Sequence, residues 1–342
     1  MKSTVQRVSE RNLINRIART VPSSGSGLLV PIGDDAAVLK SPRRCDWVVS
    51  CDFSLEGVHF LAAFHPPESV GYKSLARAVS DLAAMGALPR YYLLSMALPL
   101  RRTGDWLARF LAGMRRSARE LGVVLAGGDT SEYSRICISI TVIGEASPRM
   151  HALRSGARPG HAIYVSGHLG SSELGLRLLH SRRGLRKEFH SLLRPHLFPR
   201  VRISLGRWLA ENRIASAMID LSDGLSADLD RLCRASCVGA RLFSSMIPTV
   251  KFQPSLCRSG SHQMGDPLDL ALHGGEDYEL LFTVPPRAEK RLSSYPGKLL
   301  LTRIGQIIPG KSVELVSPEG DTSKLIPRGW EYFRGRVRKL DC

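Results

Sequence analysis

The sequence has no long hydrophobic segment, and this absence argues against a membrane-spanning protein. A helix needs about 18 to 20 consecutive apolar residues to cross a bilayer, and the longest apolar runs, residues 91–100 and 136–144, are far shorter. Both runs are typical of buried strands. The segment MKSTVQRVSERNLINRIART at the start has no apolar core of the kind that secretory signals carry. We therefore expect a soluble protein in the cytoplasm with no membrane partner.

The sequence also lacks the cysteine and histidine patterns of disulfide-rich and zinc-binding proteins. Its seven cysteines are odd in number and include no Cys-x-x-Cys pair, which argues against a disulfide framework and against a zinc knuckle. The ten histidines show no His-Glu-x-x-His spacing, and no Gly-x-Ser-x-Gly elbow is present. Zinc-dependent and serine-dependent hydrolases are therefore disfavoured.

Negative charge is scarce, because 31 acidic residues face 48 lysines and arginines and leave a net charge of +17. Such an excess favours polyanionic partners such as nucleotides, nucleic acids or acidic lipids. The densest basic part, residues 182–207, has few interleaved aromatic residues, so a solvated basic face is favoured there. A basic nucleic-acid-binding protein remains an alternative of another class. This alternative predicts that the protein is retained on DNA or RNA in a salt-sensitive way.

Segments with helical and strand patterns alternate along the chain. The apolar spacing predicts helices at residues 5–20, 67–86, 105–121, 172–181, 201–211 and 226–235. Strands are predicted at residues 28–39 (interrupted by GDD), 48–52, 91–98, 123–129, 136–143, 162–166, 217–220, 239–243 and 278–284. Pro, Gly and Arg concentrate at residues 147–160, where a domain boundary is expected. We predict an α+β or α/β fold with two domains, residues 1–148 and 149–342.

Aspartates recur where apolar runs end or glycines force a turn. They are Asp34, Asp35, Asp52, Asp129, Asp220 and Asp223, and Asp81 adds a carboxylate on an apolar helix. If these carboxylates converge, their mutual repulsion costs several kcal/mol unless cations lie between them. A set of oxygen ligands suits Mg²⁺, which commonly binds carboxylates together with substrate phosphates. The pattern therefore favours a magnesium-dependent enzyme that uses a nucleoside triphosphate.

Glycines beside these carboxylates fit the same interpretation. Gly127 and Gly128 precede Asp129, the pair 274–275 precedes Glu276, and Gly224 opens a helix. Glycine lets the backbone approach a phosphate closely, and a helix N-terminus attracts anions. A single Gly-Gly pair is more often only a turn, so the conjunction with the aspartates carries the argument.

One apparent nucleotide-binding motif is rejected. Residues 305–312, GQIIPGKS, match the phosphate-loop pattern G-x-x-x-x-G-K-S. That loop must lead into a helix, whereas the following VELVSPEG has a short β pattern broken by Pro318 and Gly320. We interpret the segment as a hairpin turn and Lys311 as a surface lysine.

The assembled motifs resemble the thiamine-monophosphate kinases, in the superfamily of aminoimidazole ribonucleotide synthetase and selenophosphate synthetase. The matching pieces, in the family's order over nearly the whole chain, are IGDDAAV, CDFSLEGVHF, SDLAAMGA, AGGDTS, RSGARPG, IDLSDGLSADL, GGEDYELLFTV and RIGQI. The resemblance implies ATP-dependent, in-line phosphorylation of thiamine monophosphate to thiamine diphosphate with Mg²⁺. It also implies the two-domain aminoimidazole-ribonucleotide-synthetase-like fold, whose N-terminal sheet domain forms a homodimer and whose C-terminal α/β domain completes the active site.

The resemblance assigns roles to individual residues. Implied metal ligands are Asp35, Ser50, Cys51, Asp52, Asp81, Asp129, Asp220 and Asp223, of which Asp52, Asp129 and Asp223 are the implied catalytic residues. ATP is implied to contact Gly128, Asp129, Arg154 and Ser222, and thiamine monophosphate to contact His59, Glu276 and Trp330. Cys51 stands where the family usually has threonine, so its backbone carbonyl is the expected ligand, and the position of Trp330 often holds another aromatic residue.

The implied reaction needs alignment and charge neutralisation more than proton transfer, because the acceptor is already a phosphate oxygen. No strong general base is therefore expected, and Arg154 can offset charge at a phosphate. The nearest alternative is a related ATP-dependent enzyme of the superfamily with a different acceptor. ATP consumption that depends on thiamine monophosphate separates the two.

The motif assignment makes a first prediction. Replacing Asp52 or Asp129 by Asn should abolish phosphoryl transfer and leave the fold intact, because each change removes a metal-binding charge at constant size. A kinase assay together with circular dichroism measures both properties. Full activity in either variant would overturn the assignment.

Overall fold

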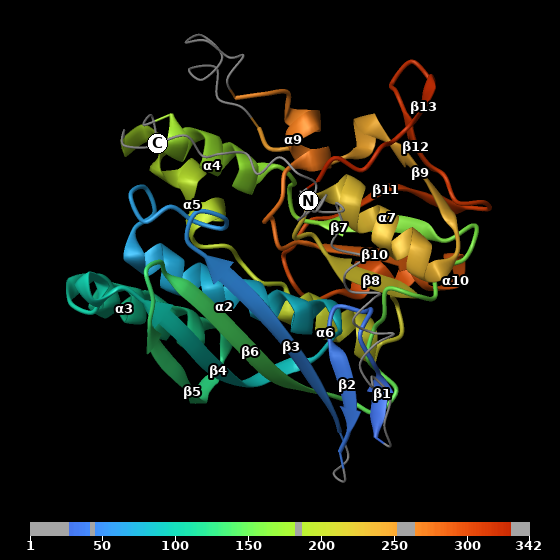
Figure 1. Ribbon diagram of the computed structural model, residues 1–342. Helices are drawn as coiled ribbons and strands as arrows, with labels where there is room; N and C mark the ends of the chain where they lie inside the picture. The colour runs from blue at the N-terminus through green and yellow to red at the C-terminus, as the bar shows by residue number, and fades with distance from the viewer. Residues whose placement is uncertain (1–26, 42–44, 182–186, 252–263, 330–342) are drawn as a thin grey trace, which may run out of the picture.

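The structure is a computed structural model that describes residues 27–41, 45–181, 187–251 and 264–329 (Figure 1). The helix predicted at residues 5–20 and the predicted substrate residue Trp330 lie outside these ranges. Within them, no helix combines the length and apolar character needed to cross a membrane.

The first half of the chain forms a six-stranded sheet in the order β1-β2-β3-β6-β4-β5. Its strands are β1 (Leu28–Val30), β2 (Ala37–Lys40), β3 (Asp46–Leu55), β4 (Leu88–Leu98), β5 (Val124–Glu132) and β6 (Cys137–Ala146). Neighbours are antiparallel except for β4 and β5, which run parallel. A parallel pair needs a long crossover, and helix α3 supplies it.

Two helices, α2 (Pro67–Ala84) and α3 (Asp105–Leu121), pack on one face of this sheet, with the 3-10 turn η1 (Leu100–Arg102) before α3. Each helix is followed by a glycine with positive φ, Gly86 at 70° and Gly122 at 69°, which ends the helix without steric strain. Leu75 and Phe110 of the helices and Ile140 of β6 belong to one buried cluster.

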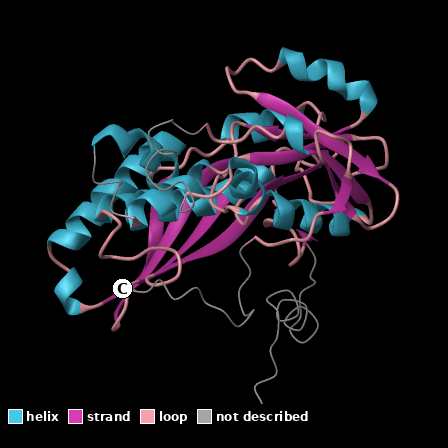
Figure 2. Cartoon of the chain, turned by 90° about the horizontal axis from the view of Figure 1, so that it is seen from above, coloured by secondary structure: helices cyan, strands magenta, loops and turns pink. Residues whose placement is uncertain are grey.

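The other face of the sheet keeps its apolar side chains exposed. Phe53 is 56% exposed, Tyr91 45% and Val124 62%. Figure 2 shows the helices of this half on one side of the long strands. Exposed apolar side chains gathered on one face of a sheet are typical of interaction surfaces.

The second half forms a seven-stranded sheet in the order β13-β12-β9-β11-β7-β10-β8, antiparallel except for β12 beside β9. Its strands are β7 (Ala162–Ser166), β8 (Ala217–Asp220), β9 (Gly239–Phe243), β10 (Leu280–Val284), β11 (Leu301–Ile308), β12 (Val313–Val316) and β13 (Thr322–Lys324). Its helices are α4 (Ser171–His180), α5 (His190–Leu197), α6 (Ile203–Glu211), α7 (Leu225–Ser236), α9 (Pro267–His273) and α10 (Pro286–Glu289), with 3-10 turns η3 (Lys187–Phe189), η4 (Ser244–Met246) and η6 (Lys290–Ser294). The whole is an α+β fold.

The predicted strands β7, β8 and β9 and the predicted helix α3 have the bounds that the sequence indicated. Helices α5 and α9 were not predicted. Helix α5 contains Pro195, which disguises a helical pattern. Helix α9 has only seven residues, although Asp266 caps it by accepting a hydrogen bond from the backbone N–H of Asp269 at 3.1 Å.

Rejection of the phosphate-loop motif agrees with the structure, because β12 and not a helix follows GQIIPGKS. The predicted hairpin is wrong, however. Strands β11 and β12 do not pair with each other, since both pair with β9 between them. Gly239 lets β9 fit there, because a Cβ at this position would lie 2.6 Å from the backbone oxygen of Ser312.

Helices α2 and α3 touch through two reciprocal glycines. A Cβ on Gly71 would lie 2.0 Å from the backbone oxygen of Phe110, and one on Gly113 would lie 1.9 Å from that of Glu68. Real Cβ atoms do not approach backbone oxygens so closely, so any larger residue forces the helices apart.

Gly71→Ala and Gly113→Ala should each lower the free energy of unfolding by about 1–3 kcal/mol. The gain of about 1 kcal/mol from the helix propensity of alanine is too small to offset the separation of two backbones. Urea unfolding measures the change. Arg115→Ala, on the exposed side of α3, is the control and should shift stability by less than about 0.5 kcal/mol; equal stability of all three variants would refute the close contact.

Candidate functional site

Helix α2 lies between the two domains and contacts both. It packs on β3 and β6 of the first sheet and also contacts β8, α5 and α6 of the second domain (Figure 1). Lys73, Arg77 and Asp81 follow one another at intervals of four residues, which places them on one face of the helix. Each of these side chains interacts with residues from another segment, as described below.

Three carboxylates meet near the C-terminal end of this helix face. Asp35 comes from the loop after β1, Asp81 from α2 and Asp220 from the end of β8, and one oxygen from each lies within 4.8 Å of the others. Ser50 on β3 donates to Asp81 Oδ2 at 2.5 Å, and Ser80 donates to Asp220 Oδ2 at 2.6 Å. The structure thus brings together four of the predicted metal ligands, Ser50 included.

The cluster carries more negative charge than its surroundings balance. Burial, and then the neighbouring carboxylates, raise the pKa values of Asp81 and Asp220 well above the ordinary range. Asp35 Oδ2 is buried and has no hydrogen-bond partner among the described residues. A buried acceptor of this kind, beside two further carboxylates, fits a hard divalent cation that takes oxygen ligands.

Arginines pair with the remaining acids around the cluster. Arg154 binds the other oxygen of Asp35 at 2.5 Å, and Arg77 binds Asp52 through two nitrogens at 2.9 and 3.2 Å. Arg231 bridges Asp223 at 2.5 Å and the buried Asp228 at 2.6 Å. Part of the large positive charge of the chain therefore neutralises its own acidic motifs.

Asp52 points toward α2, and the sheet register extends its row across three neighbouring strands. Residues paired directly in a sheet place their side chains on the same face. The row that faces the helices consists of Asp52, Ile140, Leu94 and Gly128. A Cβ on Gly128 would lie 1.8 Å from the backbone oxygen of Leu94, so strand packing alone requires glycine at this predicted ATP-binding position.

Asp129 lies in the adjacent row, on the exposed face of the sheet. That row consists of Phe53, Ser139, Ser95 and Asp129. Asp129 is exposed on the edge strand β5, three strands from Asp52, which corresponds to about 14 Å. Within one chain the structure does not bring Asp129 to the carboxylate cluster.

The side chain of Cys51 also lies on the exposed face. Its Sγ is 3.3 Å from Ser139 Oγ, so the thiol points away from Asp52. The geometry of β3 therefore excludes metal binding by the Cys51 thiol within this site. Metal binding by the Cys51 backbone carbonyl stays a prediction.

Glu276 stands opposite Asp52, in a loop with unusual backbone geometry. Glu276 and Tyr278 have φ values of 66° and 51°, a left-handed conformation that costs energy in residues with a side chain. The backbone N–H of Glu276 donates to the carbonyl of Ser222 at 2.7 Å. Asp277 fixes the loop further by accepting hydrogen bonds from the N–H groups of residues 170 and 172 at the start of α4, at 2.7 and 3.0 Å.

His59 is held as a neutral hydrogen-bond donor. Burial, followed by the charge of Arg77, lowers its pKa to about 3. Its Nδ1 accepts a hydrogen bond from the backbone N–H of Leu55 at 2.9 Å, which leaves the ring proton on Nε2.

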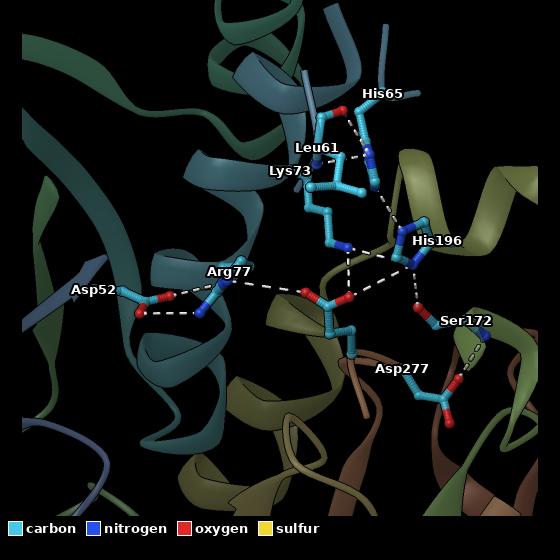
Figure 3. Close-up of polar contacts among 9 residues, drawn as sticks. Asp52, Leu61, His65, Lys73, Arg77, Ser172, His196 and Asp277 are labelled. Atoms are coloured by element: carbon cyan, nitrogen blue, oxygen red, sulfur yellow. Dashed lines mark hydrogen bonds and ion pairs between the residues drawn. The ribbon is translucent and has the colours of Figure 1, made fainter. Parts of the chain in front are cut away.

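Sequence reasoning missed Lys73, Arg77 and His196, which link these groups (Figure 3). The signal for the first two is their spacing of four residues ahead of Asp81, since charged residues do not belong on the buried face of a helix without partners. Nothing in the sequence around His196 indicates its position.

Comparison with known families gives a match over most of the chain. Residues 33–146 match AIR synthase related protein, N-terminal domain, and residues 158–317 match AIR synthase related protein, C-terminal domain. Thiamine-monophosphate kinase of Bacillus subtilis is 33% identical over 96% of this chain and 100% of its own length. The Escherichia coli K12 enzyme of the same name is 35% identical over 95% of this chain and 98% of its own length.

A solved structure agrees with these relatives. The structure of AaThiL complexed with AMPPCP and TMP superimposes with a TM-score of 0.82 at 32% identity. The superposition covers 96% of this chain and 100% of the AaThiL chain.

The repulsion within the cluster makes a prediction about stability. A carboxyl whose pKa is raised on folding stabilises the folded state only while it is protonated, and this stabilisation is lost as the pH rises through the raised value. Asp220→Asn should therefore raise the free energy of unfolding of the metal-free protein at pH 8 by about 1–2 kcal/mol. The gain should shrink as the pH falls.

Thermal unfolding with EDTA and with Mg²⁺ checks this prediction. Wild type should gain stability on addition of the cation, by about 2.7 kcal/mol at one hundred times the dissociation constant, and Asp220→Asn should gain less. A variant that is less stable than wild type in EDTA at pH 8 would contradict the repulsion argument.

Proposed function

The chain belongs to the thiamine-monophosphate kinases among the AIR synthase related proteins, and we propose on this premise that it transfers the γ-phosphoryl group of ATP to thiamine monophosphate. The product is thiamine diphosphate. One observation of the structure carries the proposal: the carboxylate cluster of Asp35, Asp81 and Asp220 lies beside the face of α2 that carries Arg77, and Arg77 in turn faces Glu276. Carboxylates for a cation and a polar residue for the organic acceptor thus lie along one face of α2.

Mg²⁺ is the proposed metal, because all donors in the cluster are oxygens and one of them, Asp35 Oδ2, is buried without a partner among the described residues. The residues that would hold it are Asp35, Asp81 and Asp220, together with Asp52 and Asp223 at the margin. When bound, the cation would offset the negative charge of the phosphates and keep donor and acceptor in line.

The protein residues supply orientation. Arg154 and Ser222 lie beside the cluster and are the proposed contacts for ATP, and His59 is a proposed contact for the acceptor. Glu276 offers a carboxylate oxygen to the thiamine part of the acceptor. No residue needs to remove a proton, because the attacking atom is a phosphate oxygen.

A homodimer that pairs the exposed sheet faces is the proposed assembly. Phe53, Tyr91 and Val124 give that face its apolar character, and burying it would be favourable by about 25 cal/mol per Å². The dimer would also explain the position of Asp129. Its side chain points away from the cluster of its own chain and toward the surface where a second copy would lie. We propose that Asp129 serves the partner's site.

We also propose the division into residues 1–148 and 149–342, which is supported by the separate sheets on either side of residues 147–161. The cytoplasmic location stays a prediction from the sequence.

The proposed reaction is tested by incubating the purified protein with ATP, Mg²⁺ and candidate acceptors. We expect ADP and thiamine diphosphate to form from thiamine monophosphate, and no ADP to form with unphosphorylated thiamine or with aminoimidazole ribonucleotide. Activity with another phosphate acceptor and none with thiamine monophosphate would favour a different enzyme of the superfamily. Retention on DNA at near-physiological salt, without kinase activity, would favour the nucleic-acid alternative.

The role of Asp129 is tested by mixing two inactive variants, Asp52→Asn and Asp129→Asn, after mild dissociation and reassociation. If Asp129 serves the partner's site, half of randomly formed dimers contain one intact site, so about a quarter of wild-type activity should return. If Asp129 acts in its own chain, every site in the mixture lacks one aspartate. No recovered activity, with mixed dimers shown by mass spectrometry, would therefore exclude the proposed arrangement.

A further inference from the structure

Lys73 is a buried lysine in the middle of α2, and its main partner belongs to the other domain. Its side chain is 7% exposed, and its Nζ lies 2.6 Å from Glu276 Oε2. Burying an ammonium group costs several kcal/mol unless a partner compensates for the loss of water. The ion pair therefore connects α2 to the loop that holds Glu276.

Two histidines continue the contacts of Lys73, His196 from the second domain and His65 from the first (Figure 3). Lys73 Nζ lies 3.3 Å from Nδ1 of His196, and Nε2 of His196 lies 3.1 Å from Nε2 of His65. Burial lowers the pKa of both rings, that of His65 to about 4. Because an ammonium group only donates, His196 accepts at Nδ1 and donates through Nε2 to His65. Nδ1 of His65 lies 3.2 Å from both the N–H and the carbonyl of Leu61, and in this tautomer it donates to the carbonyl.

Ser172 holds the same ring from another side. Its Oγ lies 3.1 Å from His196 Nδ1, and its backbone N–H is bound by Asp277, the neighbour of Glu276 in sequence. The ammonium group of Lys73 thus contacts Glu276 of the loop and His196 of α5, and Ser172 of α4 holds His196 in turn.

Glu276 receives a cation at each oxygen. Oε2 faces Lys73 at 2.6 Å, and Oε1 faces Arg77 at 3.8 Å, whose guanidinium also binds Asp52. Burial raises the pKa of Glu276, but Lys73 and then Arg77 outweigh burial and lower it. The carboxylate is thus ionised and oriented, and at 22% exposure its side chain can still be reached by a ligand.

We infer that Lys73 is a positioning residue for thiamine monophosphate: it holds the Glu276 carboxylate in the orientation that binds the thiamine part of the substrate, without touching the substrate itself. This inference rests on the proposed function. It assigns substrate affinity to a residue of the first domain that acts through a residue of the second. Lys73 contacts Glu276 and His196 and, among the described residues, no carboxylate of the cluster, so the inference leaves the proposed metal and ATP contacts unchanged.

The alternative is an ion pair that only stabilises the fold. Such a pair can often be replaced by apolar residues without loss, because the cost of desolvation consumes the Coulombic gain. A purely structural role therefore predicts that Lys73→Met, which leaves Glu276 buried without its cation, lowers stability and leaves the affinity for thiamine monophosphate unchanged. The positioning role predicts that the affinity of the folded Lys73→Met protein falls.

The test uses Lys73→Met, Glu276→Gln and the double variant in the full-length protein. Lys73→Met should raise the KM for thiamine monophosphate by about ten- to a hundredfold, the range for losing a hydrogen bond to a charged group. The KM for ATP and kcat should stay within about threefold, since neither depends on Glu276. Isothermal titration of thiamine monophosphate without ATP should show the same loss of affinity.

The double variant removes the buried pair without leaving one charge alone, so it should fold even if Lys73→Met does not. Its affinity should equal that of Glu276→Gln, because Lys73 acts only through this carboxylate. Lys324→Met, at an exposed lysine of β13, is the control and should bind as wild type. Wild-type affinity in a folded Lys73→Met protein, or losses that multiply in the double variant, would overturn the inference.

The same experiment separates this inference from the proposed function. Failure of the wild type to phosphorylate thiamine monophosphate would refute the function. If the wild type is active and folded Lys73→Met binds thiamine monophosphate as the wild type does, the function stands and the positioning role is refuted.

Discussion

Repulsion among buried carboxylates is the constraint around which this molecule is built. Asp35, Asp81 and Asp220 come from three segments far apart in the sequence and would move apart in water. Packing of the two domains against α2 forces them together, and hydroxyls of Ser50 and Ser80 and the guanidinium of Arg154 satisfy some of their oxygens. The fold thus holds together carboxylates that repel one another, and the proposed cation would offset this repulsion.

The basic residues nearest the site belong to the same balance of charge. Arg77, Arg154 and Arg231 each bind an acidic motif residue, so local charges cancel even though the chain carries +17 overall. On α2 the charge of the residues that face the site changes sign once, from Lys73 and Arg77 to Asp81. One helix face can therefore receive an anion at one place and offer carboxylates to a cation at another.

Much of this organisation could be predicted from the sequence. The apolar periodicity predicted α3 and three strands of the second sheet with their bounds, and the recurrence of aspartates at chain turns predicted a carboxylate cluster. Pairing between distant strands could not be predicted, because a local pattern does not state a partner; the supposed hairpin before β12 failed for this reason. The strand register also places the Cys51 thiol and the side chain of Asp129 on the sheet face opposite to Asp52. A shift of one position along a strand turns a side chain to the other face, and local patterns do not give the register. His196 could not be found at all, because a buried histidine has no periodic signature.

The spacing of four residues along α2 also limits how the chain can change over evolutionary time. Each added residue turns an α-helix by about 100°, so inserting one residue between Lys73 and Asp81 would carry Asp81 off the shared face. The same insertion would shift Gly71 relative to Gly113 or carry the later residues away from β8. Surface loops can gain or lose residues freely, whereas the length of this helix between its functional positions is fixed.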